Sequence, residues 1–160
     1  TMKKILPLFL LLFLITGNNC RALSVSPQYI EERMQESRRY LSLLQQTAQS
    51  CAEIRVILRR GGKAPVLIPL NRQQQDGIRK LIMRMLPVVA DYRLRKVSKK
   101  YSSRLQFMDA QGEILAEFAT TEVASEKGWQ PSQVSLSKEE LKLWLQYVRQ
   151  DYIEQLIRQQ

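Results

Sequence analysis

Residues 53–70, EIRVILRRGGKAPVLIPL, constrain the fold more than any other stretch. Ile54, Val56 and Leu58 alternate with other residues, a pattern typical of a strand that buries one face. A Gly-Gly turn follows and a second apolar run returns, which predicts a β-hairpin. Pro69 has no N–H to donate, so the second strand is expected at a sheet edge. Because half-apolar strands need cover on one face only, helices should gather on that face.

Three other segments show the apolar periodicity of amphipathic helices. The first begins at Ser26-Pro27, with serine as the N-cap and proline at the first helical position. Its apolar stripe is Ile30, Met34, Ser37, Leu41, Leu44, Ala48 and Cys51. A stripe this shallow favours packing on the parent domain over the alternative, a coiled-coil helix that binds a partner. Cys51, at its end, is expected to pack as a small apolar residue.

The second and third helices each begin with a capping box, Asn71 with Gln74 and Ser137 with Glu140. Pro87 is expected to end the second helix. The apolar stripes are Ile78, Leu81, Ile82, Met85 and Leu86 in the second helix, and Leu141, Trp144, Leu145, Val148, Tyr152 and Leu156 in the third. From these stripes we expect Ile82 and Leu145 to lie in the core.

A second hairpin is predicted where Leu105 and Phe107 alternate before a turn at 109–112, and the alternation resumes at 114–118. Phe107 is therefore a further core candidate. Residues 120–131 are polar and are expected to form a long loop, and a short strand is expected at 133–136.

Together these elements predict a single α+β domain over residues 23–160. The expected architecture is an antiparallel sheet of about four to five strands with helices packed on one face, in the order α-β-β-α-β-β-(β)-α.

Residues 1–22 have the layout of a secretory signal peptide. Two lysines precede the apolar run Ile5–Ile15, and small polar residues follow it. A membrane-spanning helix needs about 20 apolar residues, so this run is too short to favour a retained anchor. Small residues at Cys20 and Ala22 predict cleavage before Leu23.

Two other fates of Cys20 stay open. A lipoprotein leader would attach lipid to this cysteine, but such leaders place Gly, Ala or Ser directly before it, and here that residue is Asn19. Cleavage after Gly17 or Asn19 would instead leave Cys20 free to form a disulfide with Cys51 in an oxidising compartment.

Composition argues against most catalytic sites. The chain has no histidine, the commonest general base and metal ligand, and only two cysteines, so the usual zinc sites are excluded. Neither a G-x-S-x-G elbow nor an S-x-x-K motif with its partners is present. The pairs Glu31-Glu32 and Glu139-Glu140 fall in first turns of expected helices, where acids stabilise the helix dipole. We therefore expect a non-catalytic protein with no cofactor and no metal.

The candidate binding residues lie in a basic segment, residues 93–104. They are Arg93, Arg95, Lys96, Lys99, Lys100, Tyr101 and Arg104. From Lys96 onward cations would fall on both sides of a strand, so 96–103 is expected to be a loop or hairpin tip beyond the core. Its cations could bind phosphates or an acidic protein surface around Tyr101; an ordinary solvated loop is the alternative.

The leader carries three of the 25 basic residues and no acid, so the remaining chain has a net charge of +7. An exported basic protein meets phospholipid headgroups, phosphorylated glycans and acidic proteins. Nucleic acid is not expected as a partner, because the chain shows neither a recognition-helix pattern nor an aromatic RNA-binding motif.

These observations predict an exported bacterial envelope protein, in the periplasm or outside the cell, that acts as a binding or inhibitory module. In outline it is similar to small exported inhibitor and immunity proteins. The alternatives are a lipid-anchored or membrane-associated structural envelope protein and a small carboxylate-dependent hydrolase.

Mass spectrometry of the protein recovered from an exporting bacterial host checks the leader prediction. We expect an N-terminus at Leu23 and a mass without lipid, because the residues before Leu23 fit a signal-peptidase site. A chain that retains residues 1–22, or one that carries lipid on Cys20, would contradict this expectation.

Overall fold

The computed structural model describes residues 25–89, 101–120, 123–125 and 132–148. The chain divides into two compact units, one up to Glu32 and one from Arg33 onward. In the first unit, Ser26 Oγ accepts a hydrogen bond from the backbone N–H of Tyr29 at 3.2 Å. Helix α2 (Pro27–Ser50) therefore begins where the sequence predicts. Among the described residues, no helix has both the length and the apolar character needed to cross a membrane.

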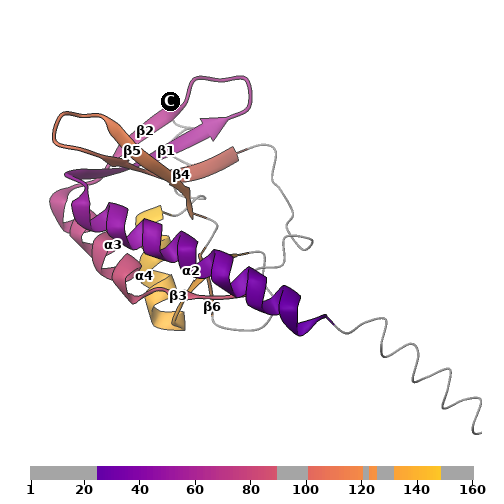
Figure 1. The fold of residues 1–160 in the computed structure, drawn as a ribbon. Coiled ribbons are helices and arrows are strands. Elements are labelled where there is room, and N and C mark those ends of the chain that lie inside the picture. The colour runs from indigo at the N-terminus through magenta and orange to yellow at the C-terminus, as the bar shows by residue number, and fades with distance from the viewer. Residues whose placement is uncertain (1–24, 90–100, 121–122, 126–131, 149–160) are drawn as a thin grey trace, which may run out of the picture. The chain divides into compact units, whose positions relative to one another are not determined.

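The second unit is built on a four-stranded antiparallel sheet (Figure 1). Its strands are β1 (Glu53–Arg60), β2 (Val66–Pro69), β4 (Tyr101–Met108) and β5 (Ile114–Ala119), in the order β2-β1-β4-β5. Both predicted hairpins are confirmed, because β1 pairs with β2 and β4 pairs with β5. Pro69 lies in the edge strand β2, where a missing N–H is tolerated.

The turns of both hairpins depend on glycine. Gly62 has a φ of 70° and Gly112 a φ of 83°, a left-handed conformation that glycine adopts without steric cost. In the second turn, Asp109 Oδ1 accepts hydrogen bonds from the backbone N–H groups of Gln111 at 2.9 Å and Glu113 at 2.8 Å. The aspartate therefore stabilises the turn, as its position predicts.

Strand β4 begins earlier than the sequence predicts. Residues 101–103 were expected in a loop, but Ser103 pairs with Leu58 and Tyr101 with Arg60, so β4 pairs with the whole of β1. Ser103 is 2% exposed, and its carbonyl oxygen accepts a hydrogen bond from Thr120 Oγ1 at 3.1 Å. The prediction was wrong here because backbone pairing with β1 continues through residues whose side chains carry no apolar alternation.

A second, smaller sheet was not predicted as such. It consists of β3 (Leu86–Pro87), β7 (Val134–Leu136) and β6 (Val123–Ser125), in the order β3-β7-β6, and β6 and β7 run parallel. β7 confirms the expected short strand, whereas β6 lies within the expected loop. Leu86 is exposed in β3 instead of continuing the helical stripe, because a residue before proline disfavours helical backbone angles.

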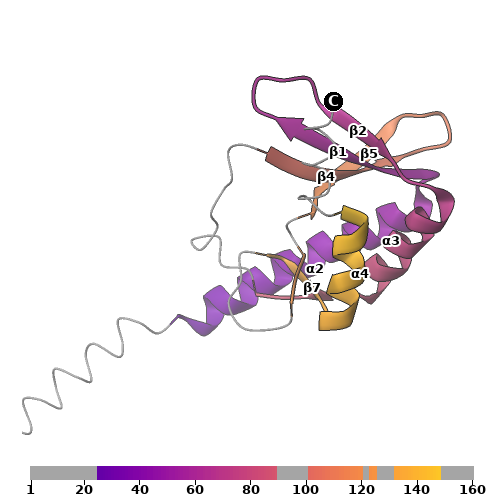
Figure 2. The ribbon, with the colours of Figure 1, turned by 180° about the vertical axis from the view of Figure 1, so that it is seen from behind.

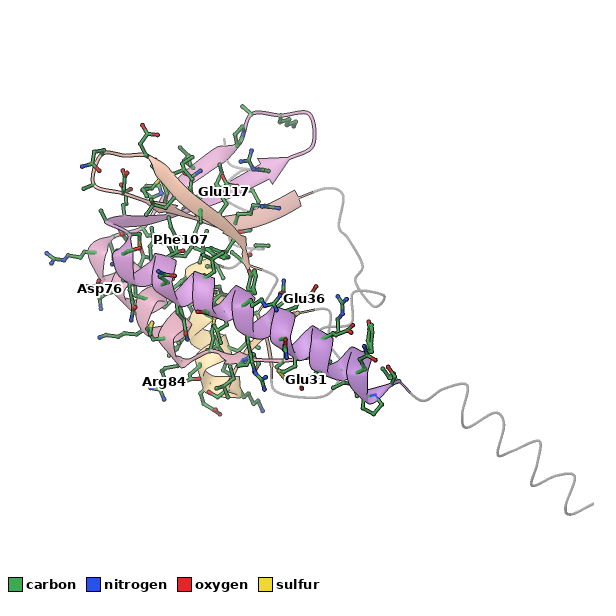
Figure 3. The ribbon with its side chains drawn as sticks, viewed as in Figure 1. Glu31, Glu36, Asp76, Arg84, Phe107 and Glu117 are labelled. Atoms are coloured by element: carbon green, nitrogen blue, oxygen red, sulfur yellow. The ribbon has the colours of Figure 1, made fainter. Side chains whose placement is uncertain are left out.

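The helices pack on one face of the four-stranded sheet, which confirms the predicted α+β architecture (Figures 1 and 2). They are α2 from Arg33 onward, α3 (Arg72–Arg84) and α4 (Lys138–Val148). The residues buried between sheet and helices include Ile54, Val56, Leu58, Ile78, Ile82, Phe107 and Trp144. Phe107 contacts Phe118 edge to face, with ring centroids 5.4 Å apart (Figure 3).

Side-chain hydrogen bonds hold α3 in place. Its predicted capping box is present, with Asn71 Oδ1 and Gln74 Oε1 each accepting from the other residue's backbone N–H. Gln75 Oε1 accepts from the backbone N–H of Ile54 at 2.9 Å, which joins α3 to β1. Arg79 donates to carbonyl oxygens at the C-terminal end of α2, including that of Ala48 at 3.2 Å, where a cation is favourable.

Cys51 lies at this same junction and packs as predicted. It is a free cysteine, 7% exposed, and its Sγ donates to the carbonyl oxygen of Ala48 at 3.4 Å. Cys20 and the rest of the expected leader lie outside the described residues.

The buried face of α4 differs from the prediction. Trp144 and Val148 are buried, but Leu145 is 47% exposed. Tyr147 packs against the core from the side of α3, so the buried arc of α4 is centred nearer Trp144 than the sequence suggests. Leu145 lies beyond the far edge of that arc.

Alanine substitutions in the second unit check these faces. Ile82→Ala is expected to lower the free energy of unfolding by about 2 to 5 kcal/mol, because it leaves a cavity at a fully buried site. Leu145→Ala, the matched control, should change it by about 0.5 kcal/mol or less. Urea denaturation of the two variants measures both values. Equal losses would contradict the orientation of α4.

Candidate functional site

Most of the basic segment lies outside the described residues, namely Arg93, Arg95, Lys96, Lys99 and Lys100. Tyr101 and Arg104 lie in β4. Arg104 pairs with Ile57 on one side and Ala119 on the other, so it belongs to the sheet face opposite the helices. The phosphate or protein clamp expected from this segment stays a prediction.

The outer face of the sheet, opposite the helices, carries Arg104 together with Arg55 and Arg59. Glu117 accepts hydrogen bonds from Arg59 Nη2 at 3.0 Å and from Gln106 Nε2 at 2.9 Å. Arg55 Nη2 donates to Met108 Sδ at 2.8 Å, and its Nε is buried without a hydrogen-bond partner among the described residues. The arginines of this face surround the buried Ile57 and Met108, and Figure 3 marks Glu117 on β5.

A concave site lies on the other side of the molecule, between α3 and α4. We call it the α3–α4 groove; its volume is about 710 Å³. Its lining residues are Arg72, Gln73, Asp76, Gly77, Lys80, Leu81, Arg84, Glu140, Leu143 and Tyr147. Figure 2 shows α4 beside α3 below the sheet, and Figure 3 labels Asp76 and Arg84 on α3. A groove of this size can bind a ligand or a segment of a partner.

One charged row follows α3 along this groove: Arg72, Asp76, Lys80 and Arg84, each four residues from the next. Residues at this spacing share one side of a helix. Asp76 is paired with Arg79 Nη1 at 3.1 Å. Arg72 and Lys80 have no ion-pair partner among the described residues, and both are exposed. The groove therefore presents two unpaired cations.

Glu140 closes the groove on the α4 side. Burial alone would raise the pKa of its carboxyl group, but hydrogen bonds from the Ser137 backbone and hydroxyl, with the nearby Arg84 guanidinium, outweigh burial and lower that pKa. Glu140 completes the predicted capping box by accepting from the Ser137 backbone N–H at 3.2 Å. Its charge is therefore already matched by Arg84 within the fold.

Tyr147 reaches α3 at Gly77. A Cβ atom placed on Gly77 would lie 2.5 Å from Tyr147 Oη, so the absence of a side chain permits this close approach. Leu143 lies one turn before Tyr147 on α4 and is 45% exposed. Within the part of the chain that the structure describes, the Tyr147 hydroxyl has no hydrogen-bond partner. The groove thus combines an apolar wall with a free phenolic donor.

Sequence reasoning did not predict this groove. The four-residue spacing of charges from Arg72 to Arg84 was visible, and so was the spacing of Leu143 and Tyr147. These signals lie on helices separated by more than 50 residues. Only the packing of α4 against α3 brings them together.

Among the described residues, no group of three or more Cys, Asp or Glu side chains could hold a metal ion. Comparison with protein-family models, with curated proteins and with solved structures gives no match.

The lowered pKa of Glu140 predicts a pH dependence of stability. A carboxyl group whose pKa is lower in the folded state contributes stability above its ordinary pKa of 4.5, and loses it as pH falls through the folded value. The difference in free energy of unfolding between the wild type and Glu140→Gln should therefore be largest at neutral pH and shrink below pH 4.5. Urea denaturation across pH measures it, with the exposed neighbour Glu139→Gln as control. A difference that grows on acidification would contradict the assignment.

Proposed function

We propose that the chain is an exported, non-catalytic binding module of the bacterial envelope, and that it binds an acidic protein partner through the α3–α4 groove. One observation carries this proposal. Arg72 and Lys80, which have no ion-pair partner among the described residues, line the same groove as the exposed apolar side chain of Leu143. We expect such a module to inhibit the protein that it binds, as an immunity protein inhibits a toxin.

The apolar wall supports a macromolecular partner. Leu143 is 45% exposed although it lies beside the partly buried Tyr147. Covering apolar side chains stabilises a complex by about 25 cal/mol per Å² of apolar area removed from water. An apolar centre with a polar rim is typical of protein–protein interfaces.

The charge of the groove supports an acidic partner. Its two carboxylates, Asp76 and Glu140, are both paired with arginines of the fold. Arg72 and Lys80 are left without partners among the described residues. The chain without its expected leader has a net charge of +7, which attracts an acidic protein over long range.

The same geometry weakens the hydrolase alternative for this groove. A general acid needs a carboxyl group that stays protonated near the working pH, and so a raised pKa. Glu140 has a lowered pKa. The lipid-anchored alternative depends on Cys20, and the mass of the mature protein tests it.

Site-specific photocrosslinking in the bacterial envelope tests the proposal. A photoreactive phenylalanine analogue at Leu143 should give one main adduct with an acidic protein, because this position lies in the groove. The same analogue at Leu43, an exposed leucine of α2, is the matched control and should give none. Arg72→Glu with Lys80→Glu should abolish the Leu143 adduct, with little change in melting temperature.

A variant with Lys96, Lys99 and Lys100 changed to Glu shows whether the basic segment adds to this binding. Weaker crosslinking would indicate that the segment contributes. An unchanged adduct would leave the groove as the principal site. Equal adducts from Leu143 and Leu43, adducts with lipid alone, or no protein adduct at all would contradict the proposed function.

A further inference from the structure

The cations of the α3–α4 groove are spread along α3. Arg72 and Arg84 are 12 residues apart, which corresponds to about 18 Å along the helix axis. Lys80 lies between them, and Asp76 interrupts the row. A compact anion such as phosphate needs donors that converge on one point. This spacing instead fits an elongated ligand that contacts successive turns of α3.

The apolar contacts of the groove recur with a helical period. Leu143 and Tyr147 are one turn apart on α4, and Leu81 lies on the facing side of α3. A third helix laid along two packed helices presents apolar residues at i, i+3, i+4 and i+7 to such a surface. The exposed Leu143 and the partly buried Tyr147, one turn apart, give the groove an apolar strip on which one face of an amphipathic helix can pack.

Gly77 lets Tyr147 approach α3 closely at the groove. Because it has no side chain, Tyr147 contacts α3 directly, and the free hydroxyl remains at the groove wall. Arg72 and Lys80 provide two places where carboxylates are favourable.

We propose that the α3–α4 groove binds an amphipathic helix of a partner protein, with apolar residues on one face and carboxylates on its flank. Arg72 and Lys80 are two turns apart, so the matching carboxylates lie about seven or eight residues apart on the bound helix. This inference rests on the proposed function and specifies the partner segment that the groove recognises.

Fluorescence anisotropy with synthetic peptides and the full-length mature protein tests the inference. The probe is a panel of helical peptides of about 18 residues, with leucines on one face and glutamates seven or eight residues apart. One control panel scrambles the same residues so that no apolar face forms, and another replaces the glutamates with lysines. We expect the amphipathic acidic peptides to bind at least tenfold more tightly than either control.

Paired variants locate the binding site. Arg72→Glu with Lys80→Glu should weaken binding at least tenfold. Lys138→Glu with Lys142→Glu makes the same charge change on exposed residues of α4 outside the groove, and should weaken it about twofold or less. Raising the salt concentration should weaken binding to the wild type, because the contacts are between exposed charges.

The outcomes separate this inference from the proposed function. Equal, groove-dependent binding of amphipathic and scrambled acidic peptides would overturn the helical partner and leave an acidic partner in place. Groove-dependent self-association in analytical ultracentrifugation would identify a second copy of the chain as the occupant. Binding only to anionic vesicles would identify lipid as the occupant. Either result would overturn the inference. If the peptides fail to bind but Leu143 still crosslinks to a protein, the helical partner segment is wrong and the proposed function stands.

Discussion

The burial of β1 on the side that faces the helices is the constraint on which the rest of the second unit depends. Ile54, Val56 and Leu58 point to one face of this interior strand and are inaccessible to solvent. Burying such side chains stabilises the fold by about 1.5 to 3 kcal/mol each, and the helices on that face provide the cover. The opposite face carries Arg55, Arg59 and Arg104 around the buried Ile57 and Met108, whereas the main core cluster lies on the helix side. All three helices therefore cover the same face of the sheet, and they pack beside one another there.

Hydrogen bonds from α3 to β1 and α2 then determine which side of α3 faces the core and which side faces solvent. Gln75 binds the backbone of Ile54, and Arg79 binds the last carbonyl groups of α2. These contacts hold one flank of α3 toward α2, and the core holds Ile78 and Ile82. The remaining flank, with Gly77 and Lys80, therefore faces α4 and solvent. The groove follows from the contacts that fold the domain, and no separate binding element is needed to form it.

Local signals predicted much of this fold and almost none of the groove. Both hairpins, both capping boxes and the buried Cys51 follow from residues close together in sequence, where turn and cap chemistry acts directly. The parallel pair β6–β7 and the exposure of Leu145 depend on contacts between distant segments, which periodicity cannot reveal. The groove has the same origin, because Gly77 and Tyr147 meet only after α4 docks on α3.

Arg72 departs from a rule that the other helix start in this unit obeys. It occupies the first turn of α3, where the helix dipole favours acids, whereas α4 has Glu139 and Glu140 in its first turn. A cation at that position costs about 0.3 to 1 kcal/mol. Asp76 lies one turn further along the same side of α3, but its ion pair in the described residues is with Arg79. Sequences depart from local rules mainly at functional positions. An acidic partner in the α3–α4 groove, as proposed above, would make Arg72 a favourable contact instead of a cost.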